Sequence, residues 1–182
     1  MKIGRSKTAQ IAWDFVVMED GETGENWVDQ CTIDGGNVVH DDFSAAMENL
    51  SIHGLLIAEQ IKLMPESAKT GTMYVDAMGT QWPMRPAEKA ILDDTKVTGY
   101  SLGGDDDDEG VVIILQRKMA TGKVLNITTP FTKLASDEPE YQYTSELAEA
   151  LAVVEREAVA YLEGKKAPNP QLEMFGDGTG IE

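Results

Sequence analysis

Apolar residues in this chain switch between the spacing of strands and the spacing of helices, and they do so twice. Residues 8–18 and 27–33 are rich in β-branched and aromatic side chains and each ends at a turn signal, which predicts a β-hairpin. From residue 43 to residue 61 the apolar positions recur at intervals of three and four, which predicts an amphipathic helix with Asp41 or Asp42 as its N-cap. The first half therefore reads as strands followed by a helix.

The second half repeats this order. Strands are predicted at residues 96–102, 111–115 and 124–129, and the short connections between them favour an antiparallel meander. A second amphipathic helix, capped by Thr144 or Ser145, is expected to run until Gly164 ends it. The fold class is therefore α+β, an antiparallel sheet built from the hairpin and the three-stranded meander and packed by the two helices.

A length of 182 residues suits one compact domain with tails. We expect a single α+β domain over residues 1–164. Within it, residues 64–95 mix prolines, glycines and short apolar runs, which indicates an irregular insertion with one brief strand at 73–75. Residues 165–182 carry no periodic apolar pattern and are expected to form a flexible tail.

Cysteine content and the N-terminal residues bear on localisation. One cysteine, Cys31, can form neither an intrachain disulfide nor a thiolate zinc site, which favours a reducing compartment. No apolar stretch has the length of a signal peptide or of a membrane span. The expected location is the cytoplasm, with no membrane partner.

Charge is strongly acidic overall but unevenly distributed. The chain has 32 acidic and 15 basic residues, a formal charge of -17, which excludes nucleic-acid binding over most of the surface. Residues 14–61 contain eleven acids and no lysine or arginine, whereas residues 111–133 contain no acid and four cations. These cations, the predicted nucleic-acid contacts, are Arg117, Lys118, Lys123 and Lys133.

Two alternatives remain for this basic hairpin. Its cations could track a phosphate backbone, with Lys2, Arg5 and Lys7 joining them if the N-terminal strand lies nearby. They could equally be solubilising side chains on an exposed edge. Bases of single-stranded DNA stack on exposed rings, and Phe131 and Tyr100 are the aromatic residues close in sequence.

Motifs that would indicate catalysis or metal binding lack the context they need. Ser101 stands in a G-x-S-x-G pattern, but both histidines, His40 and His53, precede it and no helix is predicted after it. The acidic run at residues 105–109 has no calcium-loop spacing and is read as a solvated loop. We therefore predict a protein that is not an enzyme and has neither cofactor nor metal.

The tail carries the most specific motif. Residues 167–170 read as a spacer stiffened by two prolines, which presents the pentapeptide Gln171-Leu172-Glu173-Met174-Phe175. This pentapeptide resembles the Q-L-x-L-F peptide by which bacterial DNA polymerases and repair proteins bind the sliding clamp. The resemblance implies that Gln171 makes polar contacts at the mouth of a groove while Leu172, Met174 and Phe175 enter apolar pockets. Alternatively, Leu172 and Phe175 fold back on the domain.

A second resemblance concerns the body of the chain. Residues 97–104, 122–126 and 130–133 are similar to small acidic proteins that recur in tailed phages and prophages of gut bacteria, which implies a viral origin but no particular chemistry.

These observations give a leading hypothesis and an alternative. The leading one is a non-catalytic phage accessory protein of DNA replication or recombination, which binds single-stranded DNA and docks on a host sliding clamp in the bacterial cytoplasm. The alternative is an anti-defence inhibitor or sequestering protein whose acidic surface mimics DNA, and a virion part is a third reading. A homo-oligomer is compatible with each of them.

Overall fold

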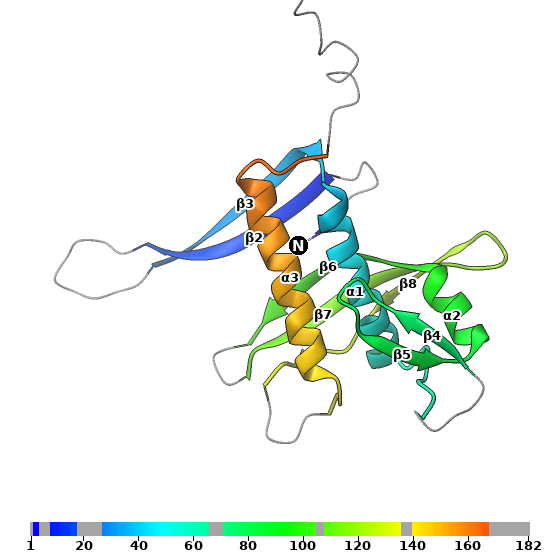
Figure 1. The fold of residues 1–182 in the computed structure, drawn as a ribbon. Helices are drawn as coiled ribbons and strands as arrows, with labels where there is room; N and C mark the ends of the chain where they lie inside the picture. The colour runs from blue at the N-terminus through cyan, green and yellow to red at the C-terminus, as the bar shows by residue number, and fades with distance from the viewer. Residues whose placement is uncertain are drawn as a thin grey trace, which may run out of the picture.

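One large antiparallel sheet forms the body of the protein, and two long helices cover one of its faces (Figure 1). The computed structural model describes residues 2–3, 8–17, 27–65, 71–104, 108–135 and 140–167. The sheet has the strand order β3-β2-β1-β6-β7-β8, with β9 also paired to β7. Its strands are β1 (Lys2–Ile3), β2 (Thr8–Val17), β3 (Trp27–Val38), β6 (Thr95–Gly103), β7 (Gly110–Lys118), β8 (Val124–Thr128) and β9 (Thr132–Lys133).

The α+β prediction is confirmed, with both predicted helices and with the hairpin and the meander as parts of the same sheet. The helices are α1 (Asp41–Ile57) and α3 (Thr144–Leu162), and they pack on β6 and β7 around a continuous apolar core. Leu50, Leu147 and Val154 from the helices are fully buried there against Ile113 and Leu115. Across the described part of the chain, every helix is too short or too polar to cross a bilayer.

The β2–β3 hairpin is longer than its sequence pattern predicted. The Gly35-Gly36-Asn37 stretch does not end the second strand, which continues to Val38. Thr8 pairs with Val38 whereas Gln10 pairs with Asp34, so the two glycines lie in a bulge of β3. Extra residues in one strand leave the ladder locally unpaired but let it resume, which explains why this turn signal was misleading.

Residues 64–95 were expected to be irregular but contain regular secondary structure. The predicted strand at 73–75 is present as β4 (Thr72–Val75), and it pairs with β5 (Gln81–Met84). A short helix, α2 (Pro86–Asp93), follows directly. Its first turn is held by a capping box in which Glu88 accepts from the backbone and side chain of Arg85, and this pairing lowers the pKa of Glu88 to about 2. The prolines that suggested irregularity lie at an edge pairing and at a helix start, where proline is tolerated.

Helix α1 approaches the sheet closely because of one glycine. A Cβ atom at Gly54 would lie 2.8 Å from the side chain of Leu115 on β7, so the glycine that weakens the helix permits this contact. The N-cap is not Asp41 or Asp42, as predicted, but His40, whose Nδ1 accepts a hydrogen bond from the backbone of Asp42 at 3.2 Å. A ring nitrogen of the imidazole thus accepts from a backbone amide of the first turn, as a serine or aspartate oxygen usually does at this position.

Helix α3 ends where the sequence predicted, but its cap and the chain after it differ. Gly164 has a φ of 112°, the left-handed conformation that closes a helix. The N-cap is Tyr143, without a side-chain cap bond, rather than Thr144 or Ser145. Beyond the helix, the first three residues of the expected tail are fixed, since Ala167 donates to the carbonyl of Val38 at 3.1 Å and Lys165 pairs with Asp42 and Glu157.

Candidate nucleic-acid interface

The meander β6–β7–β8 presents one face to the helices and the other face away from them. Side chains alternate along β7, so that Val111, Ile113 and Leu115 are fully buried in the core whereas their neighbours are partly exposed. The strand register places the outward positions of the three strands next to one another. We call this outward surface the open face, and its strand residues are Lys96, Ser101, Val112, Ile114, Gln116, Lys118, Val124, Asn126 and Thr128.

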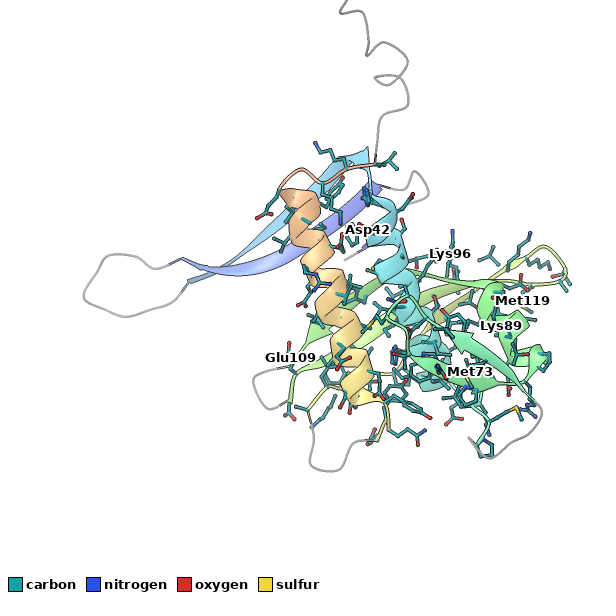
Figure 2. All side chains as sticks on the ribbon, in the orientation of Figure 1. Asp42, Met73, Lys89, Lys96, Glu109 and Met119 are labelled. Carbon is teal, nitrogen blue, oxygen red and sulfur yellow. The ribbon has the colours of Figure 1, made fainter. Side chains whose placement is uncertain are left out.

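Cations gather at one end of the meander, where Lys96 and Lys118 lie on the open face and Lys123 lies in the adjoining turn. Lys118 ends β7, Lys96 lies opposite Gln116 on β6, and Lys123 stands in the turn that leads into β8. All three side chains are exposed, and no Asp or Glu occurs in β6, β7 or β8. Figure 2 shows Lys96 near the same end of the sheet as Met119, which begins that turn, with Glu109 at the other end. The absence of acids along these strands leaves the positive potential of this end uncompensated within the sheet.

An aromatic ring lies at the opposite end of the open face. A Cβ atom at Gly110 would lie 2.5 Å from the ring of Phe131, and one at the paired Gly103 would lie 3.8 Å from it. Gly110 is an outward position of β7, so the ring rests on this face over two glycines. The Phe131 side chain is 45% exposed. Its exposed surface therefore offers a stacking position.

A break between β8 and β9 puts Phe131 in this place. Pro130 interrupts the pairing with β7. Just before it, Thr129 still binds β7, once through its backbone and once through its side chain. The Thr129 amide donates to the carbonyl of Ile113 at 3.0 Å, and its hydroxyl accepts from the Ile113 amide at 2.9 Å. Pairing resumes at Thr132, which leaves Phe131 free to lie across the sheet surface.

The four predicted cations do not form one cluster. Lys118 lies on the open face, Arg117 beside it occupies a helix-side position, and Lys123 lies in the turn between β7 and β8. The Nε of Arg117 is buried and without a hydrogen-bond partner among the described residues. Strand alternation explains the difference, because adjacent residues of β7 point to opposite faces.

Lys133 lies at the far end of β7, where it pairs with Gly110. Its Nζ forms an ion pair with Asp108, and this hydrogen bond raises the pKa of the lysine. At roughly 3.4 Å per residue of strand, Lys133 is therefore about 27 Å from the end of β7 at Lys118. Its positive charge is neutralised by Asp108.

Other candidate residues are placed as follows. Lys2 on β1 pairs with Gly99 of β6, so the N-terminal strand does lie beside the meander. Tyr100 faces the core and is buried. Ser101 stands within a strand rather than at a strand-to-helix turn. Arg5, Lys7, Gln171, Leu172, Met174 and Phe175 lie outside the described residues.

Sequence reasoning missed Lys96, because it precedes the acid-free stretch and is adjacent to Lys118 only through the β6–β7 register. The alternation in β7 could have separated Arg117 from Lys118, since buried and exposed positions there have a period of two. Comparison with protein-family models, with curated proteins and with solved structures finds no match to this chain. The chemistry of the open face must therefore indicate what it binds.

Proposed function

We propose that this protein is a non-catalytic phage accessory protein of DNA replication or recombination that binds single-stranded DNA on its open face. The observation that supports this proposal is a flat strand surface without acids in a chain of charge -17, with three lysines at one end and the exposed Phe131 ring at the other. Lysines bind phosphates, and a ring stacks on a base. The second contact would be a host sliding clamp in the bacterial cytoplasm, reached through residues 171–175.

The dimensions of the open face agree with such a ligand. About 27 Å separate the two ends of β7, a span that accommodates several nucleotides of an extended strand. Between the ends lie uncharged side chains from β7 and β8, namely Val112, Ile114, Gln116, Asn126 and Thr128. A duplex would bring a second phosphate strand towards the acidic remainder of the surface, whereas a single strand follows only the acid-free strip between the lysines and Phe131.

A titration of a fluorescent thymidine oligonucleotide at several salt concentrations tests the DNA contact. Three phosphate contacts predict a slope of about -2 in log K against log salt. Replacing Phe131 with Ala should weaken binding roughly fivefold or more, because stacking contributes about 1–3 kcal/mol per base. Phe131→Leu keeps the glycines covered and should lose affinity as well, since it removes the aromatic face.

The control for the lysines is Arg156→Gln, which removes one positive charge from the exposed surface of α3. The single substitutions Lys118→Gln and Lys123→Gln should each reduce affinity and flatten the salt dependence, whereas Arg156→Gln should do neither. Equal losses in all three variants would show that binding follows net charge alone. A titration that gives no signal at low salt would remove the DNA proposal.

The tail contact has its own test. Full-length protein should bind an immobilised bacterial sliding clamp with micromolar affinity, because three apolar side chains at roughly 1.5–3 kcal/mol each are offset by ordering costs. Phe175→Ala should abolish this binding while leaving oligonucleotide affinity unchanged. If both wild type and variant fail to bind the clamp, the tail proposal fails and the DNA proposal stands separately.

A further inference from the structure

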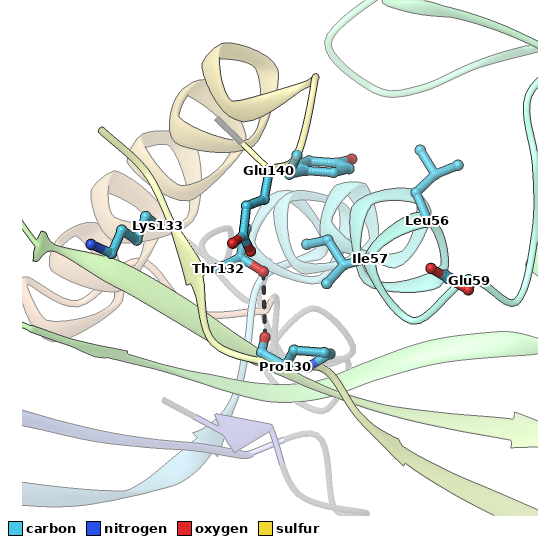
Figure 3. Close-up of a pocket in the computed structure, with 8 residues that line it drawn as sticks. Leu56, Ile57, Glu59, Pro130, Thr132, Lys133 and Glu140 are labelled. Carbon is cyan, nitrogen blue, oxygen red and sulfur yellow. Dashed lines mark hydrogen bonds between the residues drawn. The ribbon is translucent and has the colours of Figure 1, made fainter. Parts of the chain in front are cut away.

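Two adjoining clefts lie beside the C-terminal end of α1, on the helix side of the sheet, and Figure 3 shows the smaller one. Their volumes are 410 and 610 Å³. Pro130, Thr132 and Lys133 form one wall, residues 61–65 form another, and residues 140–143 run between them. The clefts share four lining residues and form one continuous trough, which we call the tyrosine groove; the shared residues are Leu56, Glu59, Glu140 and Tyr141.

Tyr141, which lines both clefts, is fixed in position by buried side chains beneath it. Its hydroxyl is 2.8 Å from Nδ1 of His53, whose side chain is only 1% exposed. Its ring meets the rings of His53 and Tyr143 edge to face, with centroids 6.0 and 5.7 Å apart. Trp82 completes this cluster beneath the groove and donates from Nε1 to Asp76 at 2.8 Å. A ring fixed in this way loses little entropy when a ligand packs against it.

Glu59 holds an unusual backbone conformation at the edge of the groove. Its φ is 53°, the only positive value for a residue other than glycine in the described part of the chain. The amide of Gln60 donates to Leu55 and that of Glu59 donates to Leu56, the pattern of a helix end that normally uses glycine at this position. A glutamate here costs stability, which is a common property of residues that bind a ligand.

No ion pair joins Glu59 or Glu140 to a cation of the described residues, although Lys62 and Lys133 also line the clefts. Figure 3 shows Ile57 between Glu59 and Glu140, whose carboxylates border the groove from either side. The hydrogen bond to Asp108 and, to a smaller extent, the charge of Glu140 raise the pKa of Lys133, but the Nζ of this lysine binds Asp108 and points away from the groove. Two exposed carboxylates beside a fixed aromatic ring match a guanidinium group, which stacks on the ring and donates paired hydrogen bonds to carboxylates.

We propose that the tyrosine groove binds an extended segment of a partner protein and that an arginine of this segment lies between Glu59 and Glu140, against the Tyr141 ring. The trough continues past the arginine position to Leu63, Met64 and Tyr143, where apolar neighbours of the arginine would pack. This site is separate from the open face, and it holds whether or not that face binds DNA.

Charge selects this occupant over the two that the chain itself could supply. Residues 168–182 contain no lysine or arginine and three acids, so the net negative charge of the protein opposes binding of its own tail in the groove. A second copy, also of charge -17, would approach against strong repulsion. A basic segment of another protein is instead attracted by the net charge before it reaches the groove.

Nuclear magnetic resonance titration of the full-length protein tests the proposal. The probe is a capped pentapeptide of alanine, leucine, arginine, leucine and alanine, and matched probes carry lysine, citrulline or glutamate in place of arginine. The arginine peptide should shift the ring resonances of Tyr141 and Tyr143. Citrulline, which keeps the shape but not the charge, should bind at least fivefold more weakly, and the glutamate peptide should not bind.

A variant pair locates the site. The double substitution Glu59→Gln with Glu140→Gln should weaken the arginine peptide at least tenfold. The control, Glu149→Gln with Glu163→Gln, removes the same charge from the exposed surface of α3 and should change affinity less than twofold. All four side chains are exposed, so the fold should tolerate both pairs, and the comparison of peptides on wild type needs no variant.

Several results would overturn the proposal. One is the absence of shifts at Tyr141 up to millimolar peptide, and another is equal affinity for the arginine and citrulline peptides. Equal losses in the two variant pairs would assign binding to the general negative field. Tighter peptide binding to a chain ending at Ala167 would show that the tail occupies the groove. Groove resonances that shift on dilution without peptide would show that a second copy does.

Discussion

The open face and the tyrosine groove meet at one short segment and differ in charge, shape and support. Phe131 lies over Gly110 on the open face, whereas its neighbours Pro130 and Thr132 line the groove. The open face carries lysines and no acid in its strands. The groove is hollow and carries two carboxylates that form no ion pair with the described residues, with Lys62 and Lys133 also in its lining. Alternation of side chains in an extended segment is enough to give two opposite chemistries to three consecutive residues.

The two surfaces are also held in place differently. The open face depends on strand pairing and on two glycines that leave room for a ring. The groove depends on buried side chains beneath it, above all His53 and Trp82. Substitutions that add a side chain at the glycines should therefore affect the open face. Substitutions of the buried polar residues should affect the tyrosine groove.

The largest expected effect comes from Gly110→Ala. The added Cβ atom would lie 2.5 Å from the Phe131 ring and 2.6 Å from the backbone oxygen of Thr132, so the ring and the chain must both move. We expect a loss of about 3 kcal/mol in the free energy of unfolding, the upper range for overpacking. Gly103→Ala is the control, because its Cβ atom would make only an ordinary 3.8 Å contact with the same ring.

Denaturant unfolding of both variants measures this difference. Gly110→Ala should also reduce oligonucleotide affinity, since the displaced ring no longer lies on the open face. Wild-type stability in Gly110→Ala would mean that the ring turns away without cost, and the described packing of Phe131 would then be wrong.

Acid should weaken the support of the groove. Burial lowers the pKa of His53 from 6.5 to about 4, an effect that Asp76 opposes only in part. The folded state therefore binds fewer protons than the unfolded state between these pKa values, and stability is lost as pH falls through this window. Between pH 7 and pH 5 the expected loss is about 2 kcal/mol.

Comparison with His53→Gln isolates this contribution. The variant should be less stable at pH 7 but should lose less on acidification. Glu88 does not interfere, because its pKa of about 2 places its stabilising effect at risk only below pH 4.5. An identical pH dependence in wild type and variant would show that His53 is not the group responsible.

Long periodic segments were predictable from the sequence, and short or side-by-side features were not. Helices α1 and α3 and the strands of the meander have enough repeats for their apolar spacing to stand out. Strands β4 and β5 have four residues each and α2 has eight, too few for a period, and their prolines suggested irregularity. Gly35 and Gly36 likewise signalled a strand end where the ladder only bulges.

The candidate sites show the same limit. Lys118, Lys123 and Phe131 came from local sequence, but their placement at two ends of one face, and the addition of Lys96, required the strand register. The tyrosine groove was not predicted, because its residues come from three separate loops and a helix end.

A smaller effect separates the binding role of the groove from its structure. Glu59→Gly should stabilise the protein by about 1 kcal/mol, because glycine adopts the left-handed conformation without the cost of a Cβ atom. The same change should weaken the arginine peptide, since one of the two carboxylates is lost. Thermal unfolding and the peptide titration measure the two effects, and a variant that is less stable than wild type would show that Glu59 has a structural role instead.

The smallest expected effect distinguishes the two faces of the meander. Lys96→Gln should reduce oligonucleotide affinity about threefold and reduce the salt slope by about 0.7, the contribution of one phosphate contact on a single strand. Arg117→Gln removes the same charge from the helix side of β7, only one strand away, and should leave both quantities unchanged. Net charge is identical in the two variants, so a difference between them must come from the direction in which each side chain points. If Arg117→Gln weakens binding as much as Lys96→Gln, the nucleic acid does not lie on the open face. The binding site would then lie at the end of the sheet, where side chains of both faces can reach it.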